Sequence, residues 1–141
     1  MQARSVVIVS AAQIVAVGFL LWFLFRMPRP WDLQRETGTA MMILGILGII
    51  TARVQLGRSF AIRAEAHQLV THGVYSKIRN PIYVFGIVLF AGFVLVFHRP
   101  MLWLLVLALA ILQIVRARRE ARVLEATFGD AYREYRSKTW F

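Results

Sequence analysis

Four long apolar stretches constrain the fold of this chain more than any other feature. Residues 5–25 are 21 residues without a charge, and a helix needs about 20 apolar residues to cross a bilayer. Three shorter runs follow. The first of these, which starts near residue 38, reaches residue 56 if Arg53 extends its charge to the membrane surface. We therefore predict an all-α integral membrane protein with four transmembrane helices, at about residues 5–25, 38–56, 81–97 and 101–116.

The composition agrees with one small membrane domain over residues 1–141. The chain is 59% hydrophobic with a mean hydropathy of +0.62, far above the balance of soluble proteins. The first apolar run is too long for a signal peptide and lacks a small-residue cleavage site, so we expect a retained helix. Because cysteine is absent, disulfides, thiolate metal sites and a cysteine nucleophile are excluded.

The positive charges predict the orientation. With four spans and an internal N-terminus, 13 of the 17 Lys and Arg residues fall on the inner side. They lie in the N-terminus, in a loop at 57–80 with Arg53 just before it, and in a tail at 117–141 with Arg116 just before it. The positive-inside rule then places both termini and this loop in the cytoplasm, at a plasma (inner) membrane. The net charge of +10 therefore points to anionic membrane lipids as partners, and not to nucleic acid.

A polar segment at residues 67–83, HQLVTHGVYSKIRNPIY, lies between the apolar runs. Pro81 suits the first turn of a helix, with Asn80 as its N-cap. Residues 97–100 form a tight turn, so the third and fourth helices make an antiparallel hairpin. Gly45 and Gly48 are expected to allow close helix packing. After residue 115 the pattern becomes an amphipathic helix that leaves the membrane and ends at Gly129.

The hairpin brings the start of the third helix beside the cytoplasmic end of the fourth. We therefore expect a pocket where Arg79, Asn80 and Tyr83 meet Arg116 and Glu120, which are four residues apart and share a helix face. Each residue also has a simpler interpretation. The Arg residues are common topology signals, and tyrosines are common at membrane interfaces.

Other reaction classes find no support in the sequence. The three His residues lack metal-ligand spacing, so no metal site is predicted. A glycine-rich dinucleotide motif, a phosphate loop and a serine nucleophile elbow are all missing. The residues alone therefore predict a four-helix membrane protein with a polar pocket at its cytoplasmic face, and no particular reaction.

The motifs of this segment and of the tail resemble those of one enzyme family. Residues His67, Leu69, Val70, Thr71, Gly73 and Tyr75, then Arg79, Pro81 and Tyr83, and downstream Leu124, Phe128, Gly129, Tyr132 and Tyr135 follow its motif spacings. The chain resembles the isoprenylcysteine carboxyl methyltransferases and their relatives that methylate phospholipid amines. The resemblance covers roughly residues 55–136.

This resemblance implies S-adenosylmethionine as the methyl donor, with S-adenosylhomocysteine as product, bound in the cytoplasmic loop without a Rossmann domain. Arg116 and Glu120 are implied as the catalytic residues, with Arg116 facing the acceptor as the substrate-binding residue. The implied cofactor-binding residues are His67, Gln68, Leu69, Val70, Gly73, Tyr75, Arg79, Asn80, Pro81, Ile82, Tyr83 and Glu120.

Two departures from the family pattern bear on the acceptor. Asn80 replaces a His, and Asn cannot act as a base near neutral pH. Ala121 replaces a second acidic residue, which makes amine methylation less expected. The chain is therefore expected to act as a carboxyl O-methyltransferase on an isoprenylcysteine-like carboxylate, or on another lipophilic small molecule or lipidated substrate.

Three alternatives stay open: a phospholipid amine N-methyltransferase, a non-catalytic protein that binds the cofactor or a lipid, and a scaffold acting through its basic tail. Four short spans do not close a chamber by themselves, so a homo-oligomer or lipid is expected to complete it.

Overall fold

The computed structural model describes residues 18, 19, 22–24, 26, 28, 30–56 and 69–141. The chain divides into two compact units, Met1–Trp31 and Asp32–Phe141. Of the first unit, residues 18, 19, 22–24 and 26 are helical, and most of the predicted span at 5–25 lies outside the described residues. The second unit carries the rest of the fold and the candidate site.

The second unit consists of helices, without a strand among its described residues. Its elements are α2 (Leu33–Leu56), the short 3₁₀ helix η2 (Gly73–Ser76), α3 (Pro81–Phe97), the 3₁₀ helix η3 (Pro100–Leu102), α4 (Trp103–Phe128) and α5 (Asp130–Lys138). The helix at Leu33–Leu56 and the helical segment Pro100–Phe128 are long and apolar enough to cross a membrane, whereas α3 is a shorter apolar helix. The all-helical class is confirmed.

Helix α2 begins five residues earlier than predicted. The Asp32 side chain accepts a hydrogen bond from the Arg35 N–H at 2.8 Å, as an N-cap residue does. This cap starts the helix in a polar segment that hydropathy alone leaves outside the span.

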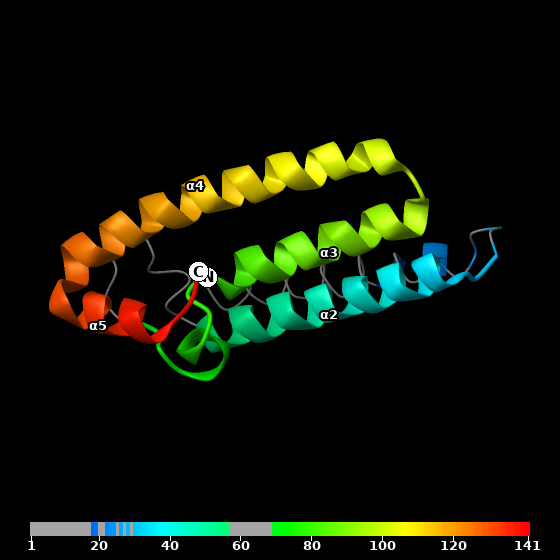
Figure 1. Cartoon of the computed structure of the whole chain (residues 1–141). Coiled ribbons are helices and arrows are strands. Elements are labelled where there is room, and N and C mark those ends of the chain that lie inside the picture. The colour runs from blue at the N-terminus through cyan, green and yellow to red at the C-terminus, as the bar shows by residue number, and fades with distance from the viewer. Residues whose placement is uncertain (1–17, 20–21, 25, 27, 29, 57–68) are drawn as a thin grey trace, which may run out of the picture. The chain divides into compact units, whose positions relative to one another are not determined.

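Helices α2 and α3 run antiparallel and pack side by side along their length (Figure 1). Glycines make the contact: Gly45 lies against Leu89, and Gly48 lies against the ring of Phe85. The predicted packing role of both glycines is confirmed. Nearer the start of α2, Gly38 and Gly92 bring the two backbones into direct contact.

A tight turn joins α3 to α4, as predicted. His98 ends α3 in the left-handed conformation, with φ 52°, and its Nε2 lies 2.9 Å from the Asp32 carboxylate. The chain then passes through η3 into α4, which returns antiparallel to α3 (Figure 1). The apolar part of α4 continues without a break into its charged part and ends at Gly129, with φ 54°. The predicted cap at Gly129 is confirmed.

Candidate active site at the start of helix α3

The turn before α3 is anchored on α2 by Gln55. The Gln55 Oε1 atom accepts a hydrogen bond from the Val74 N–H at 2.7 Å. Gly73 precedes this contact with φ +63°, a conformation that costs little only for glycine. A side chain at this position would also meet the Gln55 side chain. Gly73 therefore sets the shape of the turn.

Tyr75 is buried at the centre of the turn. Its side chain is 4% exposed and packs with Ala52 and Leu56 of α2, while Val70 and Ile82 cover the cluster. These contacts bury apolar surface between the turn and α2. Tyr75 thereby fixes the position of the turn below the first residues of α3.

Helix α5 holds the same turn from the other side. The Tyr135 hydroxyl donates a hydrogen bond to the main-chain oxygen of Tyr75 at 2.7 Å. Burial raises the pKa of Tyr135 to about 12, with smaller contributions from Tyr75 and Tyr132 and an opposing one from Arg79. The phenol is therefore protonated at neutral pH, as donation to a carbonyl requires.

Residues 77–80 pair with the last two residues of the chain. Ile78 and Trp140 form a parallel β-bridge, in which the Trp140 N–H donates to Lys77 at 3.0 Å and the Arg79 N–H donates to Trp140 at 3.2 Å. The turn is thus fixed by α2, by α5 and by the segment that follows α5.

Asn80 occupies the predicted N-cap position without the expected side-chain cap. Its carbonyl accepts hydrogen bonds from the N–H groups of Tyr83 and Val84 at 3.0 and 3.2 Å. Its side chain makes no capping hydrogen bond, because the Nδ2 atom donates instead to the main-chain oxygen of Phe141 at 3.2 Å. The cap prediction is correct for the position and wrong for the side chain.

Tyr83 joins the start of α3 to the charged part of α4. Its hydroxyl donates a hydrogen bond to Glu120 Oε2 at 3.1 Å, in a partly buried position. Arg79 lines the same hollow as Tyr83, and its Nε atom is buried and has no hydrogen-bond partner among the described residues. A hydroxyl and a carboxylate therefore meet where α3 meets α4, and a cation lines the adjoining hollow.

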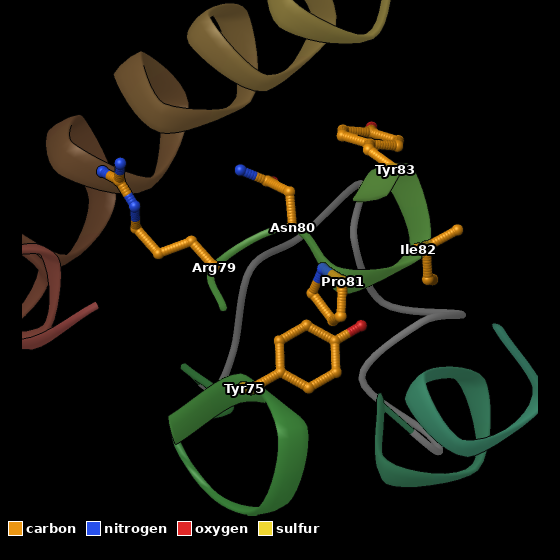
Figure 2. A pocket seen from close by; sticks show the side chains of 6 residues that line it. All are labelled: Tyr75, Arg79, Asn80, Pro81, Ile82 and Tyr83. Carbon is orange, nitrogen blue, oxygen red and sulfur yellow. The ribbon is translucent and has the colours of Figure 1, made fainter. Parts of the chain in front are cut away.

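A shallow hollow lies over the start of α3. Its volume is about 170 Å³, including space open to solvent. Tyr75 and Tyr83 lie on opposite sides of Pro81, and Arg79 and Asn80 extend away from the Tyr75 ring (Figure 2). Six residues line it: Tyr75, Arg79, Asn80, Pro81, Ile82 and Tyr83.

Residues 33–131 match the family model described as phospholipid methyltransferase. The chain belongs to this family. The match covers α2, α3 and α4 and therefore includes the turn, Tyr83 and Glu120. No curated protein and no solved structure gives a significant match. Family membership confirms the resemblance in the sequence and makes the chain a member of a methyltransferase family, and the two long apolar helices support association with a membrane.

The chemistry of the residues beside α3 fits part of S-adenosylmethionine, the cofactor that methyltransferase membership implies. The amino-acid end of that molecule carries a carboxylate and an ammonium group. The buried Arg79 Nε atom offers a donor for the carboxylate, and Glu120 offers an acceptor for the ammonium. The enclosed part of the hollow has room for about one water molecule, far less than the roughly 300–1,000 Å³ of most ligand sites, so the described residues form only part of the enclosure.

The structure divides the predicted cofactor residues into two groups. Arg79, Asn80 and Tyr83 lie on the side of α3 that meets Glu120. Tyr75, Val70 and Ile82 pack toward α2, and Leu69 is half-buried. His67 and Gln68 lie outside the described residues.

Arg116 is on α4, one turn before Glu120, as predicted. It is exposed and makes no hydrogen bond or ion pair with another residue of the described ranges. Its predicted role toward an acceptor therefore stays a prediction.

Two polar residues escaped the sequence-based prediction, although both interrupt apolar runs. Gln55 lies in the last turn of α2 and holds the turn before α3. Gln113 lies inside the apolar part of α4. A polar side chain within a membrane helix is itself a signal of function or of buried contact, and that signal was present at both positions.

Proposed function

We propose that this protein transfers a methyl group from S-adenosylmethionine to a lipophilic acceptor at the cytoplasmic membrane face, and that the cofactor lies where α3 meets α4. The observation that supports this site most directly is the hydrogen bond from Tyr83 to Glu120. It links two segments 37 residues apart in the sequence, both within the region matched to the family.

The roles of the residues follow from their charges and positions. S-adenosylmethionine supplies an electrophilic methyl group on a positively charged sulfur. Glu120 binds positive charge on the cofactor and is oriented by Tyr83, while Arg79 binds its carboxylate. The apolar surfaces of α3 and α4 keep water from the reacting groups, so positioning and desolvation supply most of the rate enhancement.

The preferred acceptor is a carboxylate attached to a lipid tail. A carboxylate is nucleophilic without losing a proton, so this reaction needs no general base. Arg116 lies one turn from Glu120 and is exposed, and a guanidinium positions a carboxylate by paired hydrogen bonds.

An amine of a phospholipid is the second candidate, and it is favoured by the family description. An ammonium group must lose a proton before it can attack. The partly buried Glu120 carboxylate is the group on α4 that would accept this proton. Ala121 replaces the second acidic residue of the family pattern. Glu120 would then have to bind the cofactor and also accept the proton of the amine, which weighs against this candidate.

Calorimetric titration with S-adenosylhomocysteine tests the cofactor site in the detergent-solubilised protein. Tyr83→Phe removes the hydroxyl that donates to Glu120, and Glu120→Gln removes the negative charge proposed to bind the ammonium group. Each should therefore weaken binding by about tenfold. The matched control is Glu134→Gln, since Glu134 is exposed on α5 and pairs with Lys138. Unchanged affinity in Glu120→Gln would place the cofactor elsewhere.

Transfer of a labelled methyl group identifies the acceptor class. The protein is incubated with labelled S-adenosylmethionine and a membrane lipid extract, and the product is treated with base. A carboxyl methyl ester releases its label as methanol, whereas a methylated amine retains it. Arg116→Leu should lower kcat/KM for a carboxylate and leave cofactor affinity unchanged, with Arg119→Leu as the control. Cofactor binding without any methyl transfer would indicate a non-catalytic binding protein.

A further inference from the structure

Gln113 is the one polar side chain in the apolar run of 15 residues from 101 to 115. It is half-buried within α4. Its Oε1 atom is buried and lacks a hydrogen-bond partner among the described residues. A buried acceptor without a hydrogen-bond partner destabilises the structure, so this position calls for an explanation.

The Gln113 side chain faces α3. A Cβ atom built at Gly86 would lie 3.9 Å from Gln113 Nε2, with no other heavy atom of the neighbouring structure within 4 Å. The amide therefore lies over Gly86, at a place where α3 presents no side chain of its own. Gly86 leaves room beside the amide on the inner side of α4.

Gln113 also shares a helix face with Glu120. Ala117, between them, is buried, and the spacing 113, 117, 120 is that of one helical face. On α3, Tyr83 and Gly86 are three residues apart and share a face in the same way. Tyr83 thus contacts Glu120 and Gly86 lies against Gln113, at positions about two turns apart on α4.

We infer that Gln113 binds an N–H group of the methyl acceptor, next to its lipid tail, between α3 and α4. This inference rests on the proposed function and names the part of the acceptor that the site recognises. The Oε1 atom accepts the hydrogen bond, and the apolar residues around Gln113 accommodate the tail. An amide N–H of a lipidated amino acid and an ammonium N–H of a phospholipid both supply the required donor.

A second copy of the chain is the competing partner for this amide. Such a copy would approach the outer face of α4, where Leu104, Leu107 and Ile111 are exposed. The Gln113 amide instead lies against Gly86 on the inner side. Its orientation therefore favours a ligand that enters between the helices.

Photo-cross-linking in the absence of cofactor tests the inference on the full chain in detergent micelles. The probe is farnesylated N-acetylcysteine with a diazirine in the farnesyl chain. Its labelling is competed either by unlabelled farnesylated N-acetylcysteine, which has an amide N–H, or by the farnesyl thioether of propionic acid, which lacks it. A second arm adds phosphatidylethanolamine as competitor, with phosphatidylcholine as the lipid that has no N–H donor.

The variant is Gln113→Met, which keeps the shape of the side chain and removes the acceptor. The matched control is Leu112→Met on the adjacent, exposed position. Wild type and control should prefer the N–H competitor by about tenfold in one arm, and Gln113→Met should lose this preference. The arm in which the preference is lost identifies the source of the N–H group.

Two results would overturn the inference: no preference for the N–H competitor in wild type, or a preference that survives in Gln113→Met. A surviving preference together with a change of oligomeric state would assign Gln113 to contact with a second copy. Failure of the proposed function is detected separately, as absence of S-adenosylhomocysteine binding in wild type. In that case, a Gln113-dependent preference for the N–H competitor would still support a lipid-binding site.

Discussion

The contact between Gly38 and Gly92 predicts a stability difference between two chemically identical substitutions on α3. A Cβ atom at Gly92 would lie 2.5 Å from the Gly38 carbonyl oxygen and 2.8 Å from the Met42 nitrogen. An ordinary C···O contact is about 3.3 Å or longer, so Gly92→Ala forces the two backbones apart by most of 1 Å. The matched substitution is Gly86→Ala, where the nearest atom is 3.9 Å away and flexible.

The expected magnitude follows from these distances. Overpacking of this kind costs about 1–3 kcal/mol, and alanine in place of glycine returns about 1 kcal/mol of helix propensity at either position. Gly86→Ala should therefore be neutral or stabilising, and Gly92→Ala should be less stable than Gly86→Ala by about 1–3 kcal/mol.

Unfolding in mixed micelles measures this difference. The solubilised protein is titrated with sodium dodecyl sulfate and followed by tryptophan fluorescence, and the midpoints of the two variants are compared with wild type. Because helix propensity cancels between the variants, the difference reports the crossing of α2 and α3. Equal midpoints for Gly86→Ala and Gly92→Ala would refute the close backbone contact.

The turn before α3 supplies the remaining predictions. Gly73→Ala places a Cβ in a left-handed conformation, which costs about 1–2 kcal/mol. Limited proteolysis should therefore cut the turn faster than in the control Thr71→Ala, at an exposed position. Tyr135→Phe leaves the buried Tyr75 carbonyl without its donor, so the fluorescence-monitored unfolding free energy should fall by about 1 kcal/mol. The pKa of Tyr135 is raised from 10.0 to about 12; the folded form therefore holds its proton more tightly, and the stabilisation is complete below pH 10 and lost as pH rises through 12. Phenolate absorbance at 295 nm should show a late-titrating component that is missing in Tyr135→Phe.

Much of the fold was predictable from local patterns. The turn between α3 and α4 and the end of α4 at Gly129 follow from proline, glycine and hydropathy. The start of α2 was not predicted from hydropathy, because the Asp32 cap extends the helix into a polar segment. The count of four spans and their orientation stay predictions, since two described helices meet the length and hydropathy of a span.

The candidate site was predictable as a location and only partly as a set of contacts. The hairpin geometry placed Tyr83 near Glu120, and their side chains are in contact. The sequence could not show that Tyr75 turns into the α2 contact or that Asn80 binds the main chain of Phe141. These two contacts involve elements that are distant in the sequence, and the local motif does not indicate them.

The continuity of α4 has a mechanical consequence. Helix α4 is uninterrupted and contains Gln113 in its apolar half and Glu120 in its charged half. An acceptor tail that separates α4 from α3 would therefore also move the Glu120 carboxylate away from Tyr83. If the cofactor and the acceptor bind as proposed, binding of the acceptor tail would therefore change the contact of Glu120 with the cofactor.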